Sequence, residues 1–312
     1  MSEALPVPFR CEVGGVALWT PRLRLLRHEA DPDAPPLDRA AIVARLRAMR
    51  DEAPAGCSGA MLAAQPCDDA LPALAREGGA LLCAPRRQPR HLVELGIGRA
   101  AYEARLGGAT RAAIARKLRK FAAADGGAID WRAYATPAQM AEFHRLARAI
   151  SGLSWQERRL DAGLPGGEAF IEGLRARARR GAVRGFLLFL RAEPVAYMLC
   201  PVDGGIVRNA HVGFDPRAAA LSPGAVLQWK VLEALMQEGV HRIFDFTPGD
   251  GQHKRLFATR SVACADVALL RPSPSVLLVL AAKMGCDLAS SGGAAFLGKL
   301  GLLAPMRALL RR

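Results

Sequence analysis

The segment 194–271 constrains the fold most. Its pattern predicts two hairpins, a helix, a strand, a short helix and a last strand, in that order. Asp203-Gly204 is typical of a tight hairpin turn. The run from Asp245 to Lys254 follows a predicted strand and carries two carboxylates, an imidazole and an ammonium group. Ionisable groups at the end of a buried strand are costly unless they are paired or used. We therefore expect the chemistry of this protein at that strand end.

The chain has 312 residues, of which 51% are hydrophobic and 23% are charged. This length predicts two domains, or two related halves, and the composition is typical of a globular protein. Strand and helix patterns alternate before residue 98, and a mixed order follows, so the expected class is α/β with a mixed sheet. A new character begins after Pro272, where the pattern is helical and apolar.

The formal net charge of +14 suggests an anionic partner. However, 37 of the 43 basic residues are arginine, and a GC-rich genome alone favours arginine. Seven scattered cysteines include no Cys-x-x-Cys pair, which indicates reduced thiols and no structural zinc site. The N-terminal residues lack a signal-peptide pattern, and no apolar run reaches the ~18 residues of a membrane span. These observations predict a cytoplasmic protein.

A predicted helix begins at Ser222-Pro223-Gly224-Ala225. The free N–H groups of a helix start bind anions such as phosphate, and a glycine lets a ligand approach the backbone. Ordinary capping by Ser222, with proline in the first turn, explains the same residues equally well.

Polar residues interrupt the two strands that flank this helix in sequence. Strand alternation places Asn209, His211 and Gly213 on one face of the first strand, and Asp245 on one face of the second. A histidine titrates near neutral pH, so His211 could accept a proton. The alternative for His211 is a satisfied core histidine.

Asp250 and Lys254 lie four residues apart on the predicted short helix, where they could form an ion pair. Taken alone, such a pair is more often a solvated salt bridge.

These features together resemble a known family. The hairpin-linked strands, the Ser222-Pro-Gly helix and the run Asp245-x-x-x-Gly249-Asp-x-x-x-Lys254 are similar to GNAT-superfamily acetyltransferases of the cellulose-biosynthesis, CelD-like branch. That branch is itself similar to FemAB-type aminoacyl transferases. The basic run from Arg111 to Lys120 resembles the arginine-rich helix that opens such domains, and the resemblance covers about residues 100–271. Family members usually carry an aromatic residue before the lysine, where this chain has His253.

The resemblance implies two GNAT-like lobes. Residues 1–98 would form a degenerate N-terminal lobe, 99–272 an acyl-CoA-binding domain with a splayed strand pair, and 273–312 a helical tail. The splay would lie between 209–213 and 244–247. Acetyl-CoA, or another acyl-CoA, would bind there with its pyrophosphate at Ser222, Pro223, Gly224 and Ala225, and no metal is needed.

The implied activity is acyl transfer to an amine or hydroxyl of a small-molecule or glycan acceptor, in polysaccharide or cell-envelope metabolism. His211 or Asp245 would act as the base or orient the acceptor, and Lys254, paired with Asp250, would stabilise charge. The supporting residues would be Asn209, Asp250, Arg116 and Arg119.

Alternative interpretations remain. Nucleic-acid binding by the basic helix is weakly indicated, because Phe121 is its only aromatic residue. The second enzymatic interpretation is use of an aminoacyl-tRNA, as in FemAB-type transferases. A further interpretation is a non-catalytic scaffold in polysaccharide assembly. Residues 292–312 could lie on the inner face of a membrane, or could pack on the domain as an ordinary helix.

Overall fold

The computed structural model describes residues 3–14, 16–67, 71–153 and 163–299. The chain divides into two compact units: unit 1 comprises 1–88 and 263–312, and unit 2 comprises 89–262. The chain enters unit 2 within the strand β7 (Ala80–Glu94) and returns to unit 1 within β14 (Arg260–Leu270). These units differ from the predicted division at 98/99 and 272/273, which stays a prediction of functional domains.

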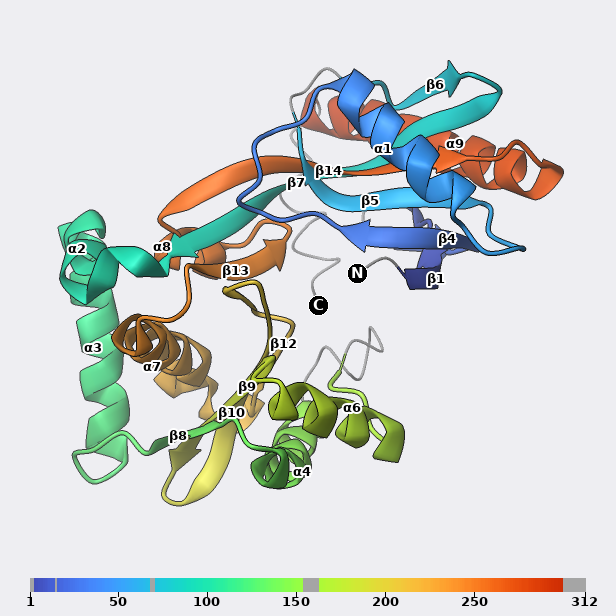
Figure 1. The fold of residues 1–312 in the computed structure, drawn as a ribbon. Coiled ribbons are helices and arrows are strands. Elements are labelled where there is room, and N and C mark those ends of the chain that lie inside the picture. Colours follow the sequence, from blue (N-terminus) through green and yellow to red (C-terminus); the bar gives the residue numbers. More distant parts are fainter. Residues whose placement is uncertain (1–2, 15, 68–70, 154–162, 300–312) are drawn as a thin grey trace. The chain divides into compact units, whose positions relative to one another are not determined.

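Unit 1 is a mixed sheet with a helix on each face (Figure 1). The strand order is β1, β4, β5, β14, in which only β4 and β5 are parallel. The hairpin of β2 and β3 is separate, and β6 pairs with β7. The elements are β1 (Glu3–Pro8), β2 (Cys11–Val13), β3 (Val16–Trp19), β4 (Arg22–Glu29), α1 (Arg39–Asp51), β5 (Gly59–Pro66), β6 (Leu74–Glu77) and α9 (Pro274–Lys299).

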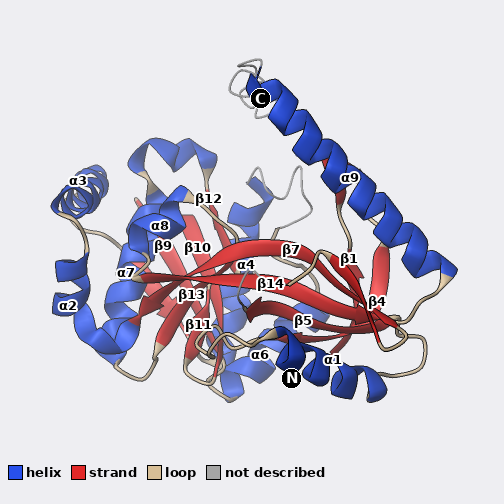
Figure 2. Cartoon of the chain, turned by 90° about the horizontal axis from the view of Figure 1, so that it is seen from above, coloured by secondary structure: helices blue, strands red, loops and turns tan. Residues whose placement is uncertain are grey.

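The alternating side chains of β5 explain why this sheet needs two helices. Leu62 belongs to the core beneath α1, whereas Met61 belongs to the core beneath α9. Asp38 caps α1, because its Oδ1 accepts the Ala41 N–H at 2.8 Å, and an aspartate is a preferred residue at this position. Figure 2 shows α9 as one long helix.

Unit 2 holds the segment that the sequence singled out. Its strands follow the order β7, β13, β11, β10, β9, β8, with β12 also beside β10, and the β11–β13 pair is parallel. The further elements are η1 (Leu95–Ile97), α2 (Gly98–Arg105), α3 (Gly108–Ala124), β8 (Trp131–Tyr134), α4 (Pro137–Leu153), α6 (Glu168–Arg179), β9 (Val183–Leu190), β10 (Glu193–Asp203), β11 (Ile206–Arg208), β12 (His211–Phe214), η2 (Pro216–Leu221), α7 (Pro223–Glu238), β13 (Ile243–Pro248) and α8 (Gln252–Phe257).

Two hydrophobic cores lie on opposite faces of the unit 2 sheet. Met198 of β10 packs in the core that contains α2, α3 and α7, whereas Tyr197 and Leu199 pack in the core with α4 and α6. Figure 1 shows α3 and α7 on one side of these strands and α4 and α6 on the other. The predicted class, a mixed α/β sheet flanked by helices, is confirmed.

Three local patterns in the sequence predict structure that is not found. Pro85 to Pro89 predict a break, but β7 is one continuous strand. The pattern from Arg99 to about Ala124 predicts one helix, but the structure divides it into α2 and α3 at Leu106-Gly107. The pattern from Asp68 to about Ala75 predicts a helix, but β6 begins at Leu74, and 68–70 lie outside the described residues.

Among the residues that the structure describes, no helix is both long enough and apolar enough to span a bilayer. The segment proposed to contact a membrane, 292–312, lies largely outside the described residues, since α9 is described only to Lys299 and its side chains only to Ser290.

Candidate functional site

The strands β11 and β13 separate at Asn209. They pair in parallel as far as Arg208 and Asp245, and the Asn209 N–H then donates to the Asp245 carbonyl at 2.9 Å. After a two-residue break the chain continues as β12, which pairs with β10 from Leu199 opposite His211 onward. The divergence therefore begins where the splay was predicted, between 209–213 and 244–247.

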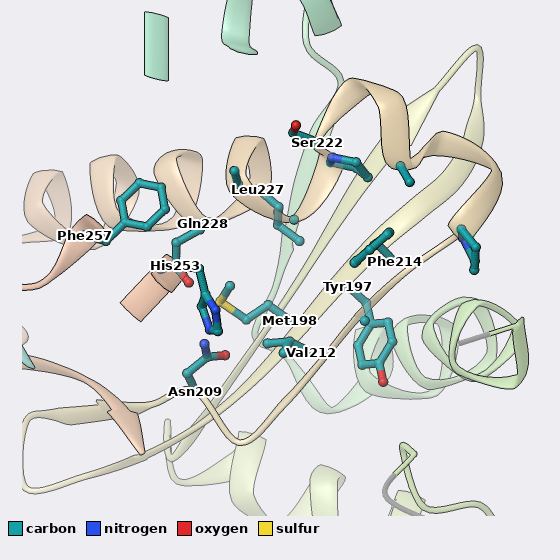
Figure 3. A pocket seen from close by; sticks show the side chains of 16 residues that line it. Tyr197, Met198, Asn209, Val212, Phe214, Ser222, Leu227, Gln228, His253 and Phe257 are labelled. Atoms are coloured by element: carbon teal, nitrogen blue, oxygen red, sulfur yellow. The ribbon is translucent and has the colours of Figure 1, made fainter. Parts of the chain in front are cut away.

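A cavity of about 680 Å³ lies beside this divergence, between β10, β12 and the first two turns of α7 (Figure 3). Its walls are largely apolar, and α8 contributes His253 and Phe257. The lining residues are Tyr197, Met198, Asn209, Val212, Gly213, Phe214, Pro216, Ala219, Ser222, Pro223, Gly224, Ala225, Leu227, Gln228, His253 and Phe257. All four residues predicted to bind the cofactor, Ser222 to Ala225, line this cavity.

The start of α7 is not capped by a side chain. Ser222 adopts a left-handed backbone conformation with φ of 54°, and its hydroxyl makes no capping hydrogen bond. Its carbonyl accepts the N–H groups of Ala225 at 3.0 Å and Val226 at 3.2 Å. Within the described part of the chain, the Gly224 N–H has no backbone acceptor. Ordinary serine capping, the alternative that the sequence left open, is therefore wrong, and the positive end of the helix faces the cavity.

Asp245 is fully buried in an ion pair with Arg90 of β7. Arg90 donates Nε to Oδ1 at 3.0 Å and Nη2 to Oδ2 at 2.5 Å, and the Thr247 N–H donates to Oδ1 at 2.8 Å. Arg208 Nε lies 3.8 Å from Oδ2. A buried carboxylate held in this way by the Arg90 guanidinium and the Thr247 N–H is fixed in position and fixes the strands around it.

The predicted pair of Asp250 and Lys254 is wrong. Lys254 Nζ donates to the carbonyls of Thr247 at 3.0 Å and Pro248 at 3.3 Å, which closes the turn after β13. Asp250 instead accepts from Arg255 Nε at 2.7 Å and lies 3.0 Å from Nε2 of His91. Arg255 first, and then His91, hold the pKa of the Asp250 carboxyl well below its usual range.

His211 lies on the opposite face of β12 from the cavity. It stands opposite Leu199 in the register, on the α4 and α6 side, and its ring meets the edge of Phe170 at 6.2 Å between centroids. The two-residue break after β11 puts Asn209 on the cavity side instead, so the prediction that Asn209 and His211 share a face is wrong. Burial lowers the pKa of the half-buried His211, which is therefore neutral at pH 7.

Arg116 and Arg119 are exposed on α3 and are not part of the cavity wall. The neighbouring Lys120 reaches η2, where its Nζ donates to the Ala220 carbonyl at 2.9 Å. Thus α3 brings positive charge to the element that leads into α7.

Three features of the site are not predicted from the sequence: Arg90, Gln228 and the place of His253 in the cavity wall. Arg90 and Asp245 are 155 residues apart in the sequence, so their pairing can be recognised only once the fold is known. Gln228 looks like an ordinary helix residue until α7 is placed on β10. Burial, with Lys254 and His91 nearby, lowers the pKa of His253.

Comparison with known proteins agrees with this geometry. Residues 108–255 match a family model described as an acetyltransferase (GNAT) domain. Over these residues the chain is therefore similar to GNAT-type acyltransferase domains. No curated protein sequence gives a match.

Two solved structures share the fold over more of this chain than the family model covers. FemX is 10% identical with a TM-score of 0.53, and the match covers 90% of each chain. The C-terminal DUF2156 domain of a protein described as a lysylphosphatidylglycerol synthetase, from Agrobacterium fabrum, is 15% identical with a TM-score of 0.50, over 83% of this chain and 81% of that one. At these identities the likeness concerns the fold alone.

Replacing Asp245 by Asn should lower the free energy of unfolding by about 3–5 kcal/mol, because it leaves the Arg90 charge buried without its partner. Denaturant unfolding measures the loss, and the double variant Arg90→Met/Asp245→Leu should recover part of it. The control is Asp203→Asn, whose exposed carboxylate lies 3.9 Å from Arg208. Unchanged stability of Asp245→Asn, together with lost catalysis, would contradict the positioning role and restore Asp245 as a base.

Proposed function

We propose that this protein is an acyl-CoA-dependent N- or O-acyltransferase, with acetyl-CoA as the first co-substrate to test. The observation that carries the proposal is the divergence of β11–β12 from β13 beside a cavity that ends at the uncapped start of α7. The GNAT-type fold of residues 108–255 agrees with it.

The cavity suits the two chemically different parts of such a co-substrate. The Gly224 N–H and the positive end of α7 would face the phosphates, since a helix start stabilises negative charge. Met198, Val212 and Leu227 supply apolar walls for the arm that joins the phosphates to the thioester.

His211 is the proposed general base. On this proposal the acceptor approaches from the α4 and α6 side and gives its proton to the neutral imidazole as its nitrogen or oxygen attacks the thioester carbonyl. The new C–N or C–O bond forms, the C–S bond breaks with its electron pair going to sulfur, and coenzyme A leaves as a thiolate that takes up a proton. Asp245 acts indirectly, because its ion pair with Arg90 holds the point from which β12 departs.

The finer assignments rest on the resemblance seen in the sequence. They are a place in the CelD-like branch, a small-molecule or glycan acceptor from polysaccharide or cell-envelope metabolism, and a cytoplasmic location with contact at the inner membrane face. A scaffold without activity is one alternative, and it predicts binding of acceptor without turnover of acyl-CoA.

Wild-type protein should bind coenzyme A and acetyl-CoA, and Gly224→Asp should weaken this binding about 10-fold, because it puts a carboxylate where the phosphates would lie. The side chain can be accommodated, since a Cβ there meets only Phe214 Cδ1 at 3.8 Å. Isothermal titration measures the affinity. Gly173→Asp in open space on α6 is the matched control. No detectable binding of either compound to the wild type would end the proposal.

His211→Gln should lower kcat by about 10²- to 10⁴-fold if His211 removes the acceptor proton. In the wild type, activity should be full at pH 7 and fall only as the pH drops through the lowered pKa of His211, below about 6.5. The acid limb of the pH–rate profile should disappear in the variant but persist in His241→Gln, which changes a buried histidine that does not line the cavity. A profile that keeps its acid limb in His211→Gln would assign the base elsewhere.

A second candidate is transfer of an aminoacyl group from tRNA. It is favoured by the match to FemX over 90% of both chains and by the exposed basic face of α3. Arg116→Glu/Arg119→Glu should then weaken salt-sensitive retention of aminoacyl-tRNA in a gel, while Arg177→Glu/Arg179→Glu on α6, with the same change of charge, should not. Turnover of acetyl-CoA with no effect of tRNA would reject this candidate.

A further inference from the structure

Three polar side chains that have no hydrogen-bond partner among the described residues converge at one end of the cavity. Figure 3 shows Asn209, Gln228 and His253 gathered beside Met198, with Ser222 farther along the cavity. Asn209 Oδ1 and Gln228 Nε2 are buried and unpaired, and the two residues are only 9% and 4% exposed. No other described side chain bonds to any of the three.

This arrangement is costly for the protein by itself. A buried amide that lacks partners loses its hydrogen bonds to water and gains none in return. Leucine would fill the place of Gln228 in α7 without that cost, since Val226, Leu227 and Trp229 beside it are buried and apolar. Gln228 lies where the cavity meets the end of the β11–β13 pairing, and a bound ligand would lie there.

We propose that Asn209 and Gln228 form a paired-amide site that binds a neutral ligand group presenting both a hydrogen-bond donor and an acceptor, such as a secondary amide. The unpaired Asn209 Oδ1 is an acceptor and the unpaired Gln228 Nε2 is a donor. A ligand group that binds both atoms must therefore supply one donor and one acceptor. His253 completes the site with a ring nitrogen. The inference rests on the proposed use of acyl-CoA, which offers this chemistry from two sources: an amide of the pantetheine arm, or a polar acyl group.

Neutral rather than charged ligand groups fit the chemistry. None of the cavity-lining residues carries a carboxylate, so an ammonium group would find no counter-charge. The neighbouring Lys254 and Arg255 are already bound to carbonyls and to Asp250. Burial keeps the His253 ring neutral at pH 7.

The test measures binding of coenzyme A, acetyl-CoA, butyryl-CoA and 3-hydroxybutyryl-CoA to wild type, Gln228→Met and Asn209→Leu. Each variant should bind about 3- to 10-fold more weakly, which corresponds to the loss of one neutral hydrogen bond. An equal loss for all four compounds assigns the site to the pantetheine arm. A loss confined to 3-hydroxybutyryl-CoA assigns it to a polar acyl group. Unchanged affinities for all four overturn the inference.

A control and a second readout separate this inference from the proposed function. Gln65→Met replaces another buried glutamine with an unpaired Oε1, in unit 1, and should leave every affinity unchanged. Without ligand, Gln228→Met should unfold at higher denaturant than the wild type, because it removes a buried unpaired amide. If wild type binds no coenzyme A compound, the proposed function fails, and this stability measurement alone decides the inference. A lower unfolding midpoint would make the amide structural and would overturn it.

Discussion

The buried ion pair between Arg90 and Asp245 is the interaction on which the site depends. It joins β7 to β13 at the last residue that β13 shares with β11, and Arg208 on β11 adds a second guanidinium to the same carboxylate. Burial of the charges raises the cost of breaking the pair, so this junction resists change. Everything that diverges beyond it, β12 on one side and the turn to α8 on the other, starts from a fixed point.

Charged side chains also fix the turn from β13 to α8, although they are less buried than Arg90 and Asp245. Lys254 binds the two carbonyls that end β13, while Arg255 and His91 bind Asp250 in the following turn. Both cations come from the first turns of α8, and His91 comes from β7, next to Arg90. These contacts set the position of α8, and so hold His253 and Phe257 in the cavity wall. Lys254 thus has a structural role, and its predicted charge-stabilising role stays a prediction.

The sequence predicted best what depends on neighbours along the chain. The Asp203-Gly204 hairpin, the Asp38 cap of α1 and the start of α7 at Pro223 follow from local rules of turn and capping chemistry. Prediction from the sequence failed where contacts between distant segments determine the structure. Partners in a long sheet outweigh Pro85 and Pro89 within β7, and Arg90 could not be paired with Asp245 before the strand order was known. Strand alternation also misplaced Asn209, because a two-residue break between β11 and β12 changes which face the chain presents.

That break also explains how one short segment can serve two sides of a sheet. An unbroken strand would place Asn209 and His211 on the same face, so that both would point toward α7 or both toward α4. With the break, Asn209 turns to the cavity beneath α7, while His211 lies on the α4 and α6 side, two residues away. A ligand held in the cavity and a proton acceptor on the opposite face can then meet only where β12 and β13 have parted. The proposed acyl transfer therefore depends on the divergence at Asn209.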